Sequence, residues 1–171
     1  MNIGKIILAS HGTPGAKAAE EAALKLCAEN GATLHHLFVV PDFWKEIFVM
    51  PDFLKGAMNM DDGWLNNAVA QIRSGASGTY VENQLAEEAA GEIDRLAKAA
   101  GALGVTYSHD IKLGRPAGCL AESCAAERFD LAVIGSPRPK GAPPGYRSSM
   151  TLYSLVRSLD APLMIIPQPK P

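Results

Sequence analysis

The side chains with the clearest capacity for chemistry follow two short apolar runs. His11-Gly12-Thr13 comes directly after the run 5–10. Hydroxyls, cations and a glycine follow the run 129–134, and these are Gly135, Arg138, Lys140, Arg147, Ser148 and Ser149. Such groups suit an anion, because glycine lets backbone N–H groups approach a phosphate and arginine can pair with it through two hydrogen bonds.

Apolar runs alternate with segments of helical periodicity along most of the chain. Strands are predicted over 5–10, 33–40, 105–113, 129–134 and 163–166, and helices over 16–30, 84–100, 117–128 and 148–159. Runs that are apolar on both faces are typical of parallel strands covered by helices on each side. A length of 171 residues fits one domain, predicted to span 1–171. The sequence therefore predicts an α/β fold with a five-stranded, parallel, doubly wound, Rossmann-like sheet.

The ends of these strands define a candidate ligand cleft. In a doubly wound sheet, ligands bind outside the carboxyl ends of the strands, near the point where the strand order reverses. The residues predicted there are Ser10, His11, Val40, Gly135, Arg138, Ser148 and Ser149.

The same segments resemble a universal stress protein domain over nearly the whole chain, except much of 41–83. Members of that family carry Gly-x2-Gly-x9-Gly-Ser/Thr after an apolar strand. Gly135 and Ser149 match its first and last positions, whereas Arg138 and Ser148 replace its other two glycines. Further matches are Gly114-x-Pro116 before a helix and Asp160-Ala-Pro-Leu before the last strand. The resemblance implies the fold shared with adenine nucleotide alpha hydrolases.

Family members that bind ATP use the glycine-rich loop for the phosphates. In this chain Pro137, Pro139, Pro143 and Pro144 each remove an N–H donor from that loop. The family's Asp-Gly-Ser/Thr after the first strand is replaced by His11-Gly12-Thr13. The chain is thus closer to the branch that lacks the full glycine motif, which implies a dimeric stress-response protein acting by binding, with a degraded nucleotide site.

Two alternatives remain open at this point. Side chains of Arg138, Lys140 and Arg147 could hold phosphate in place of N–H groups, which would make the protein a sensor of ATP or AMP. A small nucleotide hydrolase using the same cleft is the alternative from another class. The sequence carries no GxxxxGK[ST], GxSxG, HExxH or GxGxxG motif. Binding is therefore favoured over catalysis, and no catalytic residue is predicted.

The last predicted strand is a candidate dimer edge. Its residues Leu163, Met164, Ile165 and Ile166 are apolar and flanked by prolines. An open apolar edge is a pairing liability that a two-fold partner resolves. We therefore predict a homodimer joined through this strand, as the resemblance also implies.

The segment 41–83 differs from the rest, because it holds both Trp and three of the five Phe. It is predicted to be an insert of short helices starting near Asp42 and Asp52 or Asp61, followed by a loose stretch at 74–79. Its aromatic residues are predicted to form a lid or a surface for a protein partner, and they include Phe43, Trp44, Phe48 and Phe53.

Composition excludes several classes of protein. A net charge of −2 and a pI of about 6.1 argue against a nucleic-acid binder, and no apolar run is long enough to span a membrane. Cys27, Cys119 and Cys124 form no disulfide or zinc pattern, which predicts reduced thiols in the cytoplasm. Adjacent His35 and His36 should face opposite sides of a strand, so no metal site is predicted.

Overall fold

The computed structural model describes residues 2–10, 14–41, 78–136 and 152–167. Its elements, in chain order, are β1 (Lys5–Ala9), α1 (Pro14–Asn30), β2 (Thr33–Pro41), α5 (Gly78–Ala102), β3 (Tyr107–Gly114), α6 (Pro116–Ala126), β4 (Leu131–Gly135), α7 (Leu152–Ser158) and β5 (Leu163–Ile166). The strands pair in parallel in one sheet of order β3-β2-β1-β4-β5. This confirms the predicted doubly wound α/β fold.

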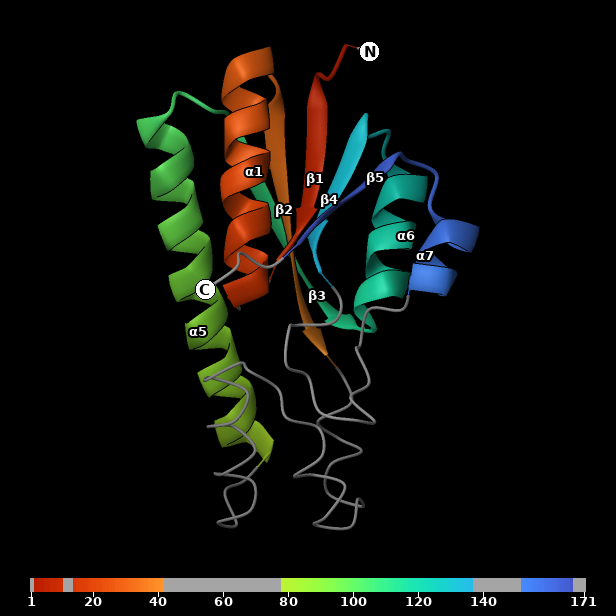
Figure 1. Cartoon of the computed structure of the whole chain (residues 1–171). Coiled ribbons are helices and arrows are strands. Elements are labelled where there is room, and N and C mark those ends of the chain that lie inside the picture. The colour runs from red at the N-terminus through yellow and green to blue at the C-terminus, as the bar shows by residue number, and fades with distance from the viewer. Residues whose placement is uncertain (1, 11–13, 42–77, 137–151, 168–171) are drawn as a thin grey trace.

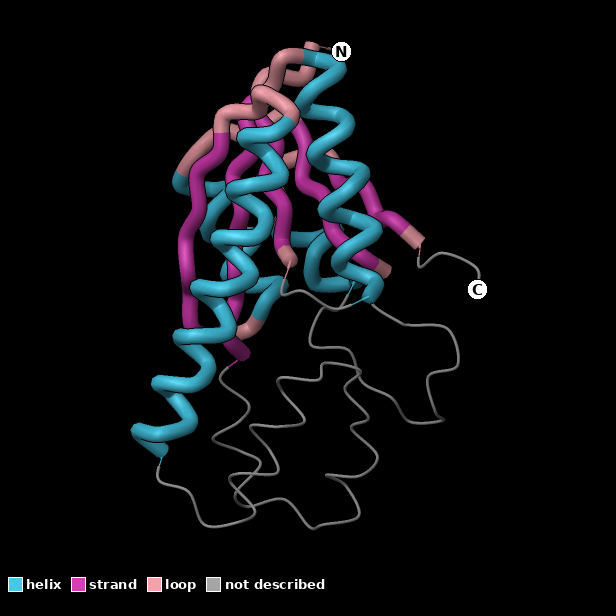
Figure 2. The backbone as a smooth tube through the Cα atoms, turned by 90° about the vertical axis from the view of Figure 1, so that its left-hand side faces the viewer, coloured by secondary structure: helices cyan, strands magenta, loops and turns pink. Residues whose placement is uncertain are grey.

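Helices cover both faces of the sheet. Figure 1 shows α1 and α5 on one face and α6 and α7 on the other. This division follows from right-handed crossovers, because the chain winds from β1 out to β3 and then returns across the sheet to β4 and β5. In Figure 2, α1 and α5 lie next to each other in front of the strands, and α5 extends past the lower ends of the strands. Those lower ends are the carboxyl ends.

The central strands are buried on both faces, which explains their continuous apolar runs. Ile6 and Leu8 of β1 belong to the cluster packed under α1 and α5, whereas Ile7 belongs to the cluster packed under α6 and α7. All three are 0% exposed. Burial of such a side chain contributes about 1.5–3 kcal/mol each, so β1 anchors both halves of the core.

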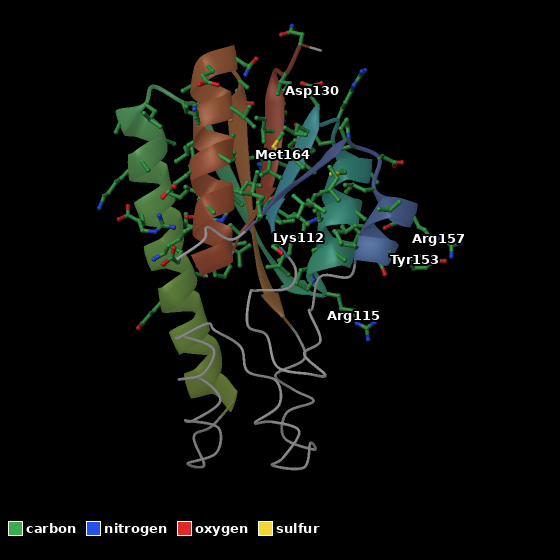
Figure 3. All side chains as sticks on the ribbon, in the orientation of Figure 1. Lys112, Arg115, Asp130, Tyr153, Arg157 and Met164 are labelled. Carbon is green, nitrogen blue, oxygen red and sulfur yellow. The ribbon has the colours of Figure 1, made fainter. Side chains whose placement is uncertain are left out.

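At the amino-terminal end of the sheet, a carboxylate joins β4 to β1. Asp130 precedes β4, and its Oδ2 accepts hydrogen bonds of 2.9 Å from the backbone N–H groups of Gly4 and Lys5. These bonds lower the pKa of Asp130. Figure 3 shows Asp130 at one end of the sheet and Arg115 at the other, which is the carboxyl edge.

The boundaries of the expected insert need correction. Pro41 is the last residue of β2, and α5 begins at Gly78, so the part of 41–83 from 78 onward is helical. The loose stretch predicted at 74–79 is wrong for Gly78 and Thr79, because the helix predicted over 84–100 continues toward its amino terminus past the apolar stripe. The predicted short helices and lid, and the predicted partner surface of Phe43, Trp44, Phe48 and Phe53, lie outside the described residues.

Within the ranges that the structure describes, no helix combines the length and the hydropathy needed to cross a membrane.

Candidate functional site

The strand order reverses between β1 and β4, and their carboxyl ends define the candidate site. Ala9 is paired with Ile134, so the residues that follow them, Ser10 and Gly135, lie at neighbouring positions. The helices that follow these two strands in the described chain, α1 and α7, lie on opposite faces of the sheet, and this reversal marks the position where doubly wound folds hold their ligands. Of the cleft residues predicted from sequence, the structure brings Ser10 and Gly135 together at this edge.

Backbone donors at this edge point into the protein. The N–H of Ser10 donates to the carbonyl of Leu37 at 3.3 Å, and the N–H of Ser136 donates to the carbonyl of Ile166 at 2.8 Å. The hydroxyl of Ser10 donates to Glu20. These three donors are therefore committed to neighbouring elements and are not directed toward a ligand.

A second part of the same edge lies where β3 ends and α6 begins. Gly114 has φ +149°, and a Cβ placed there would lie 3.2 Å from Sγ of Cys119, so the position favours glycine. Arg115 is the N-cap of α6 and Pro116 is its first residue. The side chain of Arg115 is exposed at the carboxyl edge (Figure 3). Sequence reasoning matched the flanking Gly114 and Pro116 but passed over this cation.

A buried carboxylate lies beneath the edge. Glu20 of α1 has a side chain only 4% exposed and accepts from the Ser10 hydroxyl through one oxygen and from Arg95 of α5 through the other. Arg95 also donates to Glu92 from Nη2 at 2.7 Å and from Nε at 3.0 Å. A buried charge is stable only when it is paired and hydrogen-bonded, and Glu20 meets both conditions. The pair connects α1 and α5 to the end of β1.

His36 of β2 continues this polar network. Its Nε2 lies 3.1 Å from the carbonyl of Ser10, and its Nδ1 lies 2.8 Å from Oη of Tyr107 on β3. A carbonyl can only accept, so Nε2 carries the proton and Nδ1 accepts from the Tyr107 hydroxyl. Burial lowers the pKa of His36, which keeps the ring neutral. The residue is 1% exposed, so its role is to fix the end of β1 rather than to meet a ligand.

The other sequence predictions have varied outcomes. Val40 lies on β2 past Leu37, the last residue of β2 that pairs with β1. His11, Arg138, Ser148 and Ser149 lie outside the described residues, and so do Lys140 and Arg147. Cys27, Cys119 and Cys124 are buried free thiols, and burial raises the pKa of Cys27 and Cys124 to about 11.

Glu20 and Arg95 were missed from sequence, although Glu20 had a signal. It is a charge inside the apolar stripe of its helix, between Ala16 and Leu24 at i−4 and i+4. Among the described residues, no group of three or more His, Cys, Asp or Glu side chains is arranged to hold a metal ion.

Comparison with known proteins supports the fold. A scan against protein-family models finds no match, and a search of curated proteins finds no relative by sequence. Solved structures do match over nearly the whole of this chain. The structure of the hypothetical protein MJ0577 has a TM-score of 0.67 and 13% identity, covering 100% of both chains.

Two of the similar structures are universal stress proteins with a nucleotide. One, in complex with cAMP, has a TM-score of 0.60 and 12% identity, covering 99% of this chain and 100% of its own. The other, from Arabidopsis thaliana with AMP bound, has a TM-score of 0.56 and 16% identity, covering 97% of this chain and 92% of its own. The chain therefore has the fold of the universal stress proteins, as the resemblance in its sequence predicts.

Proposed function

We propose that this protein is a dimeric, universal-stress-protein-like binding protein whose nucleotide site at the carboxyl edge of β1 and β4 is degraded. It acts at that edge through binding and interaction, without turnover of the bound ligand. The fold shared with universal stress proteins supports this proposal. The switch in strand order beside Ser10 and Gly135 supports the choice of this edge for the site.

One observation carries the proposal: the donors described at the switch point are turned inward. A phosphate site needs convergent N–H groups that are free to bind an anion. Here the N–H groups of Ser10 and Ser136 and the Ser10 hydroxyl already donate to protein acceptors. The four prolines between Gly135 and Ser148 remove further N–H donors from the chain that follows. Both features weaken the binding of a triphosphate more than they weaken the binding of a ligand that is held by shape and by stacking of its base.

A second candidate is a sensor of AMP or ATP. Two proteins of the same fold hold cAMP and AMP, which are nucleotides with a single phosphate. Arg115 adds an exposed cation to the carboxyl edge in this chain, and a guanidinium can bind phosphate without help from backbone N–H groups. In this candidate the ligand site is at the same carboxyl edge, but AMP or ATP is its physiological ligand.

Calorimetric titration with ATP and with AMP tests the two candidates. We expect no ATP binding tighter than about 10 μM, equivalent to less than about 7 kcal/mol of binding free energy. Low-micromolar or tighter binding of either nucleotide would contradict the degraded site and favour the sensor. In that case Arg115→Gln should weaken binding, and Lys98→Gln, on the outside of α5, should not. Release of nucleoside or phosphate during the titration would point instead to the hydrolase.

The dimer is proposed to form through β5. This strand is at one end of the described sheet and pairs with β4 alone, and its Ile165 is 38% exposed. Helix α7 adds apolar surface, since Tyr153 is 72% and Val156 is 77% exposed. Figure 3 shows Tyr153 and Arg157 on the outer side of α7, away from the sheet.

Sedimentation at tens of micromolar protein tests this interface. We expect a dimer, and we expect Ile165→Lys to give a monomer because a charge on an edge strand opposes pairing. The matched control is Ile111→Lys on β3, at the opposite edge, where the native side chain is 52% exposed. A monomeric wild-type protein, or a dimer broken only by the Ile111 variant, would overturn the proposed interface.

A further inference from the structure

We propose that Ser108 is an activated nucleophile, served by His35 and Asp110, that accepts acyl groups from small activated carboxylic esters. This site is on the α6 side of the sheet and is independent of the carboxyl edge. It uses three side chains to which neither the fold nor the proposed function assigns a role.

The parallel register of β2 and β3 assembles the three residues. His35 is paired with Ser108, and Asp110 follows two residues later on the same face of β3. His35 Nδ1 lies 2.8 Å from Oγ of Ser108, and His35 Nε2 lies 3.4 Å from Oδ2 of Asp110. The imidazole therefore bridges a hydroxyl and a carboxylate, one on each ring nitrogen.

This arrangement fixes the proton on the ring. An ionised carboxylate only accepts, so Asp110 holds the tautomer with the proton on Nε2. The lone pair on Nδ1 is then directed at the hydroxyl of Ser108. A nucleophile, a base in contact with it and a third group that orients the base are the signature of activated serine chemistry. In serine proteases Nε2 contacts the serine and Nδ1 contacts the aspartate. Here the two nitrogens have the opposite partners, but the imidazole still contacts both a hydroxyl and a carboxylate.

The surroundings of His35 suit a general base. Burial lowers its pKa, and this effect exceeds the opposing influence of Asp110 and Glu127, while Lys5 acts in the same direction as burial. These three charged groups come from β3, from the end of α6 and from β1, the elements around the ring. The imidazole also packs against Phe129 with ring centroids 5.5 Å apart, which restricts its orientation. His35 is therefore neutral, and able to accept a proton, at neutral pH.

The nucleophile is accessible. β3 lies at an end of the described sheet, and Ser108 and Asp110 are exposed. Leu34 N–H donates to the carbonyl of Thr106, so Thr106 and Ser108 direct their backbone groups toward β2. The N–H of His109, the residue after the nucleophile, then points away from β2. At that position it can donate to the oxygen that becomes negative during acyl transfer.

The reaction that this geometry supports is transfer of an acyl group with water as the final acceptor. Oγ of Ser108 attacks the ester carbonyl carbon while its proton moves to Nδ1 of His35. The bond to the leaving oxygen breaks, and His35 gives its proton to that oxygen or, where the group leaves as an anion, to solvent. Water then attacks the acyl-serine and gives a proton to the neutral His35. The bond between the acyl carbon and Oγ breaks, Oγ takes the proton from His35, and the carboxylic acid leaves.

The experiment uses 4-nitrophenyl acetate with the full chain and locates the acetyl group by peptide mass mapping. We expect acetylation at Ser108 with an initial burst of 4-nitrophenol. Ser108→Ala should remove both, and circular dichroism checks that the exposed substitution leaves the fold intact. The matched control is Ser158→Ala, since Ser158 is also exposed but donates to the carbonyl of Ser154 at 2.6 Å. Unmodified Ser108, or equal labelling of Ser108 and Ser158, would overturn the proposal.

Positioning is tested through the pH profile of acetylation. The rate should follow deprotonation of His35, and His35→Gln should lower it about 100-fold, the lower end of what a general base contributes. Asp110→Asn removes a carboxylate that raises the pKa of His35, so the profile should move to lower pH while the rate falls. If the three residues had only a structural role, the pH profile of acetylation would not change. An unchanged pH profile in Asp110→Asn would therefore contradict the role given to Asp110.

Discussion

Two adjacent histidines divide the molecule into a structural region and a reactive region. His36 faces α1 and α5 and is 1% exposed, with hydrogen bonds to Ser10 and Tyr107. His35 faces α6, and its partners Ser108 and Asp110 are exposed. The two rings differ because successive residues of a strand point to opposite faces. One residue type thus supports the fold on one face and, on the other, contacts two exposed side chains from a ring that is itself only 12% exposed.

The partners decide which role each ring has. The two nitrogens of His36 contact the carbonyl of Ser10 and the partly buried hydroxyl of Tyr107, where water has little access, so the loss of either hydrogen bond should cost stability. Each nitrogen of His35 contacts a side chain that water can also solvate, so the loss of either costs little stability. A reaction is therefore expected at His35, because the imidazole is held in position while Ser108 and Asp110 can exchange their contacts with water or substrate.

The largest effect should come from removal of His36. His36→Ala removes the hydrogen bonds to the Ser10 carbonyl and the Tyr107 hydroxyl and opens a cavity, which should cost about 3 kcal/mol of unfolding free energy. Urea denaturation followed by circular dichroism measures this loss. The adjacent His35→Ala serves as the matched control. Equal destabilisation by the two variants would contradict the division between the faces.

The fold was predictable because its signals are local. Buried strands such as Lys5–Ala9 read as continuous apolar runs, and each following helix has its own periodic stripe. The meeting of Ser10 with Gly135 followed from the rule for doubly wound sheets, without any knowledge of side-chain contacts. Element boundaries were less secure, as the earlier start of α5 at Gly78 shows, since the apolar stripe that marked the helix begins only later.

The side-chain networks could not be derived in the same way. The approach of Arg95 to Glu20 depends on how α5 lies beside α1, which the sequence pattern of either helix leaves open. The contact of His35 with Ser108 depends on the register of β2 against β3, which periodicity alone does not specify. The alternation of side chains along a strand predicts that His35 and His36 face opposite sides, as observed, but no local pattern in the sequence specifies their partners.

The second largest effect concerns the buried carboxylate. Arg95→Met removes the cation that pairs with Glu20 and should cost about 2 kcal/mol. This value is below that for a fully buried pair because the Arg95 side chain is 43% exposed. Glu20→Gln combined with Arg95→Met should recover part of the loss, since the introduced amide would carry no charge and could still accept from the Ser10 hydroxyl. A double-mutant cycle of urea denaturation measures the coupling, and strict additivity would count against the ion pair.

The third effect is a dependence of stability on pH. Burial lowers the pKa of His36 in the folded protein, so the unfolded chain binds more protons once the pH falls below the ordinary histidine value of about 6.5. Stability should therefore be full above that value and decrease as the solution becomes more acidic. The slope for one histidine is at most about 1.4 kcal/mol per pH unit. Urea titrations between neutral and mildly acidic pH should show a shallower slope in His36→Gln than in the wild type, and an unchanged slope would refute this assignment.

The smallest effect should be that of His35→Ala on stability. The ring packs against Phe129 and bridges two exposed side chains, so its removal loses some apolar contact but leaves Ser108 and Asp110 accessible to water. Because the His35 side chain is only 12% exposed, its truncation also leaves a partial cavity beside Phe129, and we expect a loss of about 1 kcal/mol, smaller than that of His36→Ala. The same variant should lose most of the acetylation at Ser108, because the base is gone. This combination distinguishes the two histidines. His36→Ala should unfold readily, yet Ser108 should stay reactive under conditions where this variant is folded. His35→Ala should stay folded, but its Ser108 should lose reactivity. A large loss of stability in His35→Ala would mean that both faces of β2 serve the fold alone.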